Sequence, residues 1–168
     1  MADWDALVRK HGPAVLRIAC RILGGLADAE DVTQDVFCEA WQIQASQRVE
    51  NWPGLLRRLA VLRSLDKLRR RRAHAPLTEE HLVDAADAPH DRLIARELAD
   101  RLRGCLCQLP DQQAAVFSLF YFEHLSRDEI AAAVGTTVGA VSTALSKARR
   151  NLKTALTETL QEPNCDQR

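Results

Sequence analysis

A short stretch near the carboxyl end, from Leu125 to Leu152, constrains the fold more than any other part of the chain: LSRDEIAAAVGTTVGAVSTALSKARRNL. Ser126 and Glu129 have the spacing of a capping box, in which both side chains bond backbone N–H groups at a helix start. Gly135 follows one short helix later and favours the left-handed conformation that ends helices. The stretch therefore predicts two helices joined by a tight turn.

The second of these helices combines an apolar face with small and basic residues. Its predicted core face consists of Val138, Val141, Leu145, Ala148 and Leu152. Two helices joined by a glycine-containing turn form a helix-turn-helix, which offers its second helix to the DNA major groove. Residues small enough for close approach, or able to meet bases and phosphates, are Gly139, Ala140, Ser142, Thr143, Ser146, Lys147, Arg149, Arg150 and Lys153. The alternative is a helical hairpin with a solvated basic face.

Helical periodicity extends over most of the remaining chain. Apolar residues recur at helical spacing before the glycine pair at 24–25, within 28–41, and within 53–72. A further helical block begins near residue 92 and is interrupted at 109–111, where a proline stands. No stretch alternates apolar and polar residues convincingly enough for a strand. The predicted fold class is therefore all-α.

Charge is unevenly distributed although the net charge is zero. Residues 1–72 carry 13 basic and 9 acidic side chains, whereas residues 73–93 carry 1 basic and 5 acidic side chains. The second segment also has two prolines and weak periodicity, which is typical of a linker. The sequence thus predicts two small helical domains, 1–72 and 94–160, joined by a flexible linker at 73–93 and followed by a tail at 161–168.

Four acidic residues form one stripe along the predicted helix at 28–41. Asp28, Asp31, Asp35 and Glu39 follow one another at i, i+3, i+7 and i+11. Like charges at such spacings repel mildly, so a basic partner surface would relieve the stripe. The alternative is a solvated acidic face.

The predicted helix at 53–72 is strongly basic and has a tryptophan just before it. Arg63, Lys67 and Arg70 share one stripe, and further arginines stand near both ends. Basic side chains beside an aromatic ring suit phosphate neutralisation and stacking on an exposed base. Trp52 fits a core position equally well.

Other classes of protein find little support in the sequence. No apolar run approaches the roughly 18 residues of a membrane span, and the first residues lack the apolar centre of a signal peptide, so we expect a cytoplasmic protein. The five cysteines do not form a disulfide framework, and no ligand set completes a metal site around Cys105 and Cys107. We expect neither a metal nor another cofactor. We also expect no enzyme, because no phosphate-binding glycine loop, zinc-protease motif or activated nucleophile stands out.

The order of these features resembles the bacterial sigma-70 family, and within it the small extracytoplasmic-function branch, which keeps only the second and fourth sigma regions. The segments that carry the resemblance are DAEDVTQDVFCEAW, NWPGLLRRLAVLRSLDKLRRRR and LPDQQAAVFSLFYFEHLSRDEIAAAVGTTVGAVSTALSKARRNL. Together they cover most of the chain. The resemblance implies a transcription initiation factor that binds core RNA polymerase and directs it to specific promoters.

The resemblance also implies which residues meet the polymerase. The helix at 28–41 would dock on the clamp helices of the β′ subunit, and the second domain would meet the β flap. The linker would thread toward the RNA exit path, and an anti-sigma factor is a further expected partner. The implied polymerase-binding residues are Asp28, Asp31, Gln34, Asp35, Phe37, Glu39 and Trp41.

Two promoter-binding sets follow from the same resemblance. The minus-ten set is Trp52, Arg57, Arg58, Arg63, Lys67, Arg70 and Arg71. The minus-thirty-five set is Thr136, Thr137, Gly139, Ala140, Ser142, Thr143, Ser146, Lys147, Arg149 and Arg150. The chain departs from many relatives at Leu62, where they have the asparagine that helps capture a flipped base. It also departs at Ser142 and Ala144, where they often have lysine or arginine.

Two other binding functions remain open at this point. A stand-alone helix-turn-helix regulator would usually dimerise, so that two recognition helices meet successive major grooves. An interaction module could keep the polymerase-binding helix and lack useful DNA recognition, as the departures permit. Promoter-dependent initiation separates both from a sigma factor.

Overall fold

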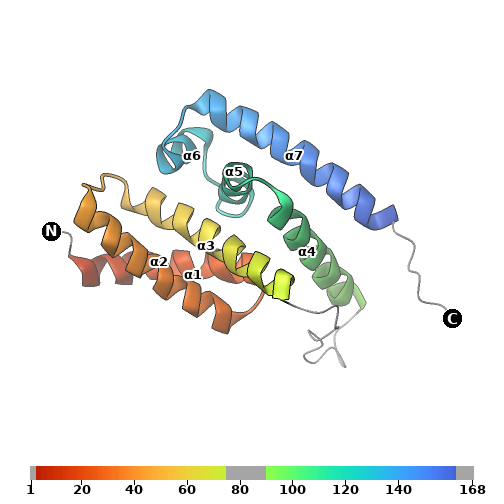
Figure 1. Cartoon of the computed structure of the whole chain (residues 1–168), viewed down its shortest axis with the longest axis horizontal. Coiled ribbons are helices and arrows are strands. Elements are labelled where there is room, and N and C mark those ends of the chain that lie inside the picture. Colours follow the sequence, from red (N-terminus) through yellow and green to blue (C-terminus); the bar gives the residue numbers. More distant parts are fainter. Residues whose placement is uncertain (1–2, 75–89, 162–168) are drawn as a thin grey trace.

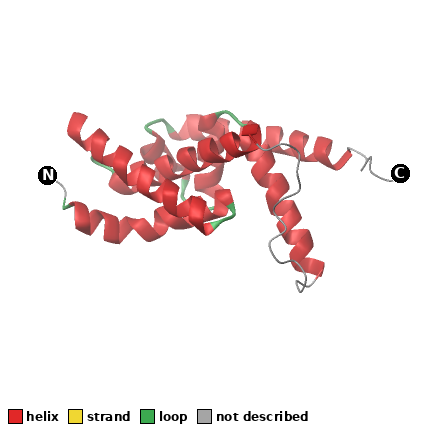
Figure 2. Cartoon of the chain, turned by 60° about the horizontal axis from the view of Figure 1, so that its bottom comes forward, coloured by secondary structure: helices red, strands yellow, loops and turns green. Residues whose placement is uncertain are grey.

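The structure is a computed structural model that describes residues 3–74 and 90–161. Figure 2 shows helices and loops, and no strand, in this part of the chain. The predicted all-α class is confirmed. The helices are α1 (Trp4–Leu23), α2 (Leu26–Ser46), α3 (Trp52–His74), α4 (His90–Gln108), α5 (Asp111–Tyr121), α6 (Arg127–Val134) and α7 (Val138–Gln161).

The predicted linker is helical at both of its ends. Helix α3 continues to His74 and α4 already begins at His90, so the predicted boundaries at 72 and 94 fall inside helices. The centre of the linker, residues 75–89, lies outside the described residues, as does the tail from residue 162.

Helix ends follow the local signals in the sequence. Gly24 ends α1 with φ at 79°, and its N–H donates to the Cys20 carbonyl at 2.8 Å. Only glycine adopts such a left-handed conformation without strain, so the chain turns here and α2 begins two residues later. Helix α3 begins after Asn51, whose Oδ1 accepts a hydrogen bond from the Gly54 N–H at 2.9 Å.

Helices α1, α2 and α3 form the first bundle (Figure 1). Its centre consists of large apolar side chains from all three helices that are fully buried: Ile18, Ile22, Val32, Val36, Leu56, Val61 and Leu65. Burying each of these is worth about 1.5–3 kcal/mol relative to leaving it exposed. The bundle therefore fixes α2 and α3 side by side.

Helices α4 to α7 form the second bundle, in which α5 packs against both α6 and α7. Leu106, Val116, Leu119, Ile130 and Leu145 are fully buried there. The two bundles also touch, because α5 and α6 lie against α3 (Figure 1). The buried residues of both bundles consequently form one connected core. The division of the sequence into two domains does not indicate this packing.

Candidate functional site

The turn between α6 and α7 has the geometry that the sequence predicts. The Glu129 N–H donates to Ser126 Oγ at 3.2 Å, and Glu129 Oε2 accepts from the Ser126 N–H at 2.8 Å. Gly135 follows α6 with φ at 72°. The Ala140 N–H donates to Thr137 Oγ1 at 3.2 Å, so the threonine caps α7. The two helices meet at 100°, within the range of a helix-turn-helix.

One face of α7 packs into the second bundle. Val141, Leu145, Ala148 and Leu152 are buried there as predicted. Val138 is different, with 39% of its surface exposed, because it stands in the first turn of α7, where the helix has not yet entered the core. Ala144 is only 7% exposed. An alanine at this buried position, where the family often has lysine or arginine, therefore removes no cation from the outer surface.

The opposite face of α7 is open. Gly139, Thr143, Ser146 and Arg150 are exposed and follow one another at i, i+4, i+7 and i+11, which is one helical stripe. Lys147 is exposed beside this stripe. The stripe and Lys147 are hereafter the recognition face. Its small residues lie toward the α6–α7 turn and its cations lie further along the helix.

Arg149, which the sequence places in the minus-thirty-five set, contacts aromatic side chains of α5. Its Nε donates to the Tyr121 hydroxyl at 2.7 Å. Its guanidinium lies 5.5 Å from the centroid of the Tyr121 ring and 5.8 Å from that of Phe120. A cation over two aromatic rings and in a hydrogen bond is held in place. Arg149 thus ties α7 to α5, away from the recognition face.

The acidic stripe of α2 has a basic partner within the chain itself. Lys67 Nζ lies 3.0 Å from Asp28 Oδ1 and 2.9 Å from Asp31 Oδ2. Arg63 binds Glu39 through two parallel hydrogen bonds of 2.6 and 2.7 Å. The ion pairs join α2 to α3 and are hereafter the α2–α3 seam; Arg71 adds a contact to Asp28 at 2.9 Å. For Asp28, Asp31 and Glu39 the basic surface that relieves the stripe is thus provided by α3 of the same chain.

These pairs shift the protonation equilibria of their members. A hydrogen bond from Lys67 is the main cause that holds the pKa of Asp28 below its ordinary value, and partial burial opposes it. The same contacts raise the pKa of Lys67, chiefly through its hydrogen bond to Asp31. The hydrogen bond to Glu39 raises the pKa of Arg63. All three shifts favour the charged forms that hold α2 against α3.

The seam makes stability depend on pH. Because the folded pKa of Asp28 is depressed, its contribution is present above the unfolded value of about 3.9 and is lost as pH falls through the folded pKa. We expect Asp28→Asn to lower the unfolding temperature near neutral pH. The difference in unfolding temperature between the native chain and this variant should shrink toward zero in acid. Thermal unfolding of both proteins between about pH 7 and pH 2.5 tests this, and a deficit that stays constant over the range would contradict it.

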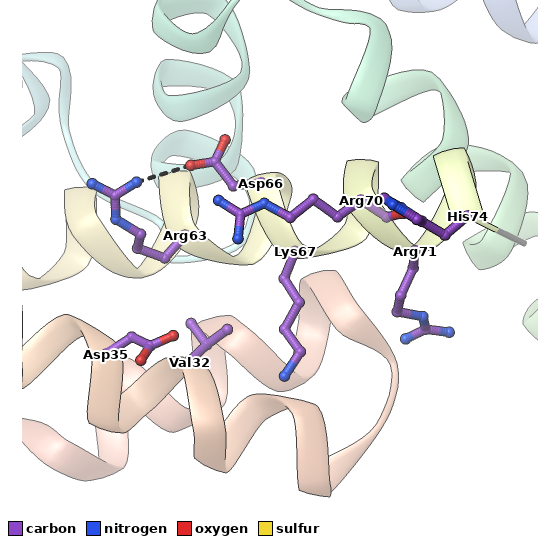
Figure 3. Close-up of a pocket in the computed structure, with 8 residues that line it drawn as sticks. All are labelled: Val32, Asp35, Arg63, Asp66, Lys67, Arg70, Arg71 and His74. Carbon is purple, nitrogen blue, oxygen red and sulfur yellow. Dashed lines mark hydrogen bonds and ion pairs between the residues drawn. The ribbon is translucent and has the colours of Figure 1, made fainter.

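A groove of about 670 Å³ runs between α2 and α3 (Figure 3). Lys67 and Arg71 point from α3 toward α2, while Arg70 and His74 lie along the side of α3 that faces away from α2. Arg70 is exposed, and no ion pair of its guanidinium occurs within residues 3–74 and 90–161. Asp35 enters from α2 and likewise has no ion-pair partner in those ranges. The groove is lined by Val32, Asp35, Arg63, Asp66, Lys67, Arg70, Arg71 and His74.

An aromatic cluster stands at the other end of α2. Trp4 packs edge to face against Phe37, Trp41 and Trp52, with ring centroids 6.2, 5.0 and 5.9 Å apart. Trp52 is half-buried in this cluster, which favours the core interpretation of that residue. Trp41 remains 48% exposed, whereas Phe37 is buried.

The exposed part of this cluster opens into a shallow apolar hollow of about 330 Å³. Trp4, Phe37, Cys38, Trp41 and Gln42 line it. Sequence reasoning missed Trp4, Cys38 and Gln42, although Cys38 and Gln42 follow Gln34 at i+4 and i+8 on α2. That spacing was the available signal for the latter two. No such signal indicated Trp4, because it lies on α1, far in sequence from the α2 residues that it contacts.

Two members of the minus-ten set face the second bundle. Arg58 lines a cleft of about 310 Å³ together with Val134 and Thr136. The charge of Arg57 acts on ionisable groups of two neighbouring helices. On α1, burial is the main cause that lowers the pKa of His11, and the charges of Lys10 and Arg57 add to it. Hydrogen bonds from Ser126, with a smaller contribution from Arg57, lower the pKa of Glu129 on α6. The charge of Arg57 is therefore within electrostatic range of both α1 and α6.

The described residues also bear on metal and membrane sites. No group of three or more His, Cys, Asp or Glu side chains among them is placed to hold a metal ion. Within the same residues no single helix is long and apolar enough to cross a membrane. Helices α6 and α7 meet that test of length and composition only when taken together across their 100° bend.

Two family models match the chain. Residues 7–74 match sigma-70 region 2, and residues 99–152 match sigma-70 region 4. The chain belongs to the sigma-70 family. The first match covers α1 to α3 and the second covers most of α4 to α7, so the two sigma regions correspond to the two bundles.

Relatives place this sigma-70 chain in the extracytoplasmic-function branch. The extracytoplasmic-function RNA polymerase sigma factor SigE of Mycolicibacterium smegmatis is 33% identical over 158 residues, which are 91% of this chain and 61% of SigE. The corresponding factor SigW of Bacillus subtilis is 25% identical over 92% of this chain and 90% of SigW. The chain therefore spans less than two thirds of SigE and most of SigW.

Two solved structures are similar to this sigma-70 chain. CnrH, solved in complex with the cytosolic domain of CnrY, has a TM-score of 0.59 and 26% identity, and the match covers 92% of this chain and 88% of CnrH. The sigma factor RpoE of Bartonella quintana, solved with the anti-sigma factor NepR, has a TM-score of 0.55 and 22% identity over 94% of this chain and 98% of RpoE. The second likeness bears on the fold alone.

Proposed function

We propose that this sigma-70 chain is a transcription initiation factor that binds core RNA polymerase and directs it to specific promoters. The observation that carries the proposal is the recognition face of α7, an open stripe of small and basic residues on a capped helix-turn-helix, in a chain that also contains sigma region 2. Small residues permit close approach to base edges, and Lys147 and Arg150 supply cations for phosphates or guanine.

The polymerase-binding surface is proposed to lie on the outer side of α2. The intramolecular pairing of Asp28, Asp31 and Glu39 makes them supports that hold α2 in place. Gln34, Asp35 and Trp41 are exposed, and the apolar hollow adjoins Trp41. An exposed tryptophan and, elsewhere on the same helix, a carboxylate with no ion-pair partner among the described residues suit a protein interface with a basic partner. We assign docking on the β′ clamp helices to these three residues, with buried Phe37 as a packing support.

The minus-ten set divides into three groups by position. Arg63, Lys67 and Arg71 are engaged by carboxylates of the seam. Exposed Arg70, which lines the same groove, is therefore the cation of this group that is proposed to bind phosphates. Trp52 stays in the aromatic cluster. The third group is Arg57 and Arg58, at the second bundle.

The minus-thirty-five set is centred on the recognition face. Thr137 contributes as the cap of α7, and half-buried Ala140 and Ser142 flank the stripe. Thr136 lies in the cleft beside Arg58. Arg149 is proposed to position α7 through Tyr121 rather than to touch DNA. The second bundle is also proposed to meet the β flap.

Further parts of the proposed function concern the linker, the domain limits, an additional partner and the cellular compartment. We propose that the segment centred on residues 75–89 follows the RNA exit path, and that the domain limits lie near 74 and 90. An anti-sigma factor is a proposed partner, as the family resemblance implies, and the similar CnrH was solved in complex with another protein, the cytosolic domain of CnrY. The chain is proposed to act in the cytoplasm as a non-enzymatic subunit.

Co-elution with bacterial core RNA polymerase on a sizing column tests the proposal. A sigma factor is expected to move to the polymerase fraction and to remain monomeric alone. A chain that elutes as a dimer and ignores the polymerase would favour the stand-alone helix-turn-helix regulator instead. A chain that joins the polymerase and supports no promoter-dependent initiation would be the interaction module.

A further inference from the structure

A second cleft lies where the turn between α1 and α2 meets the end of α3 and the middle of α4 (Figure 1). Its volume is about 980 Å³, larger than that of the groove between α2 and α3. This size is near the upper end of the range of small-molecule sites, about 300–1,000 Å³. The cleft is hereafter the arginine cleft, after two arginines of α3 and two of α4 that line it: Arg71, Arg72, Arg96 and Arg103.

Positive charge exceeds negative charge in the arginine cleft. Asp28 and Asp100 supply the carboxylates among the described residues that line it. Asp28 is shared between Arg71, at 2.9 Å, and Lys67, at 3.0 Å, which stands outside the lining. Asp100 Oδ1 lies 2.6 Å from Arg103 Nη1. Four guanidinium groups therefore face less than two full carboxylates, and this imbalance attracts an anion.

Two of the guanidinium groups lie against glycines. A Cβ atom at Gly104 would lie 2.5 Å from Arg72 Nη1, and one at Gly24 would lie 3.1 Å from Arg103 Cζ. Glycine at both positions leaves room for a flat guanidinium group on the backbone. Arg103 Nε also donates to the Arg21 carbonyl at 3.1 Å. The cations are thus held in position in the absence of a ligand, which reduces the entropy lost on binding.

The remaining wall of the arginine cleft is apolar and includes the first turn of α2. Leu23, Leu26 and Ala99 line it, and Leu26 is 59% exposed. Gly25 precedes α2 and has no side chain to cap it, so the positive end of the helix adds to the potential of the arginines. A ligand with phosphoryl groups at one end and a planar, less polar part at the other complements both walls, since guanidinium groups also stack on bases.

We propose that the arginine cleft binds a nucleotide that carries at least two phosphoryl groups. The phosphates lie against Arg72, Arg96 and Arg103, whose guanidinium groups match phosphate oxygens with paired N–H donors. The cations come from two helices, α3 and α4, so a chain of phosphoryl groups is held better than a single one. These three arginines belong to neither promoter-binding set. The proposal therefore goes beyond the proposed function and does not depend on it.

Isothermal titration calorimetry of the full chain tests the site without polymerase or DNA. The probes are ATP and GTP at about 0.15 M salt without divalent cations, with AMP and inorganic tripolyphosphate for comparison. We expect one saturable site for ATP or GTP. AMP should bind at least about tenfold more weakly, because it presents a single phosphoryl group to the arginines. Tripolyphosphate should bind several-fold more weakly, because it leaves the apolar wall uncovered.

Two double variants of α4 test the position of the site. Arg96→Gln with Arg103→Gln removes two cations of the arginine cleft, and we expect about 10- to 100-fold weaker nucleotide binding. The matched control is Arg92→Gln with Arg101→Gln, which removes the same charge from the same helix outside the cleft lining. The control should retain affinity within about twofold. Circular dichroism and thermal unfolding show that both variants are folded.

Two single variants test the charge and the geometry of the cleft separately. Asp100→Asn removes a carboxylate beside Arg103 and should tighten nucleotide binding about two- to fivefold, a gain that a folding defect does not produce. Gly104→Ala keeps every charge, favours the helix and displaces the guanidinium of Arg72, so it should weaken binding. Gly12→Ala is the control, because nothing lies within 4 Å of a Cβ at position 12.

Any of three results would overturn the proposal. The first is a native chain without saturable binding of ATP or GTP. The second is an equal loss of affinity in the two double variants, which would indicate general attraction of anions to a basic surface. The third is an arginine pair that a short single-stranded DNA needs and ATP does not, which would assign the cleft to nucleic acid. Failure to bind polymerase would count against the proposed function and would leave the calorimetry intact.

Discussion

Replacement of Asp35 by arginine is expected to weaken binding of the chain to core RNA polymerase by about 100-fold, equivalent to about 2.7 kcal/mol. Asp35 is the one member of the acidic stripe without an ion-pair partner within the described residues, and it is exposed. A reversed charge meets the basic partner surface with repulsion, which costs several kcal/mol at an interface. Titration of labelled chain with core polymerase measures the loss.

The control for this prediction is Glu158→Arg. It reverses another exposed carboxylate, near the end of α7, and should leave polymerase affinity within about twofold, because a lone surface charge contributes little. Thermal unfolding should show that Asp35→Arg is folded, since Asp35 takes no part in the seam. Native affinity of a folded Asp35→Arg variant would contradict the assignment of the docking surface.

The double replacement Lys147→Ala and Arg150→Ala is expected to reduce promoter binding of the polymerase complex by about 10- to 100-fold. In the proposed function each cation on the recognition face binds a phosphate or a guanine. Two such interactions at the lower end of the 1–3 kcal/mol known for base contacts amount to about 2 kcal/mol. The dependence of affinity on salt should also weaken, by about one unit of slope for each phosphate that is no longer neutralised. Titration of promoter DNA at several salt concentrations measures both effects.

The matched control removes two exposed cations elsewhere, at Arg9 and Lys10 on α1. It removes the same charge as the double variant and should retain promoter affinity. Arg149→Ala provides a further contrast, because loss of its hydrogen bond to Tyr121 and of its packing on two aromatic rings should lower stability. Equal reductions of promoter binding in the double variant and the α1 control would show that α7 does not bind promoter DNA specifically.

Local features of the fold were predictable because their causes lie within a few residues. Ser126 and Glu129 satisfy each other's backbone N–H groups, and Gly24 and Gly135 adopt left-handed conformations, whatever the rest of the chain does. Helical periodicity likewise identified the buried face of α7, apart from Val138. These signals were sufficient for the fold class and for the helix-turn-helix.

Pairings between helices were not predictable in the same way. The acidic stripe of α2 and the basic stripe of α3 were both visible, yet only packing of the first bundle brings Asp28 to Lys67 and Glu39 to Arg63. The environment of Arg149 depends on where α5 places Tyr121. A cation on a helix surface has the same sequence signature whether it meets DNA, a carboxylate or an aromatic ring.

The packing of the two bundles against each other was hidden for a related reason. Gly54 stands within a helix, where glycine usually only lowers stability, and nothing local indicates that it faces Ala133. The resemblance to the sigma-70 family implies only that Leu62 replaces an asparagine that helps capture a flipped base. Its packing between the bundles gives the substitution a physical role of its own.

The most direct test of a sigma function is start-site mapping with purified components. Core RNA polymerase from the organism that encodes the chain is supplied with genomic DNA fragments, with and without the chain, and the 5′ ends of the transcripts are sequenced. A sigma factor should give a discrete set of new start sites that share upstream elements and that disappear with the double variant at Lys147 and Arg150. A start-site pattern identical to that of core polymerase alone would contradict it.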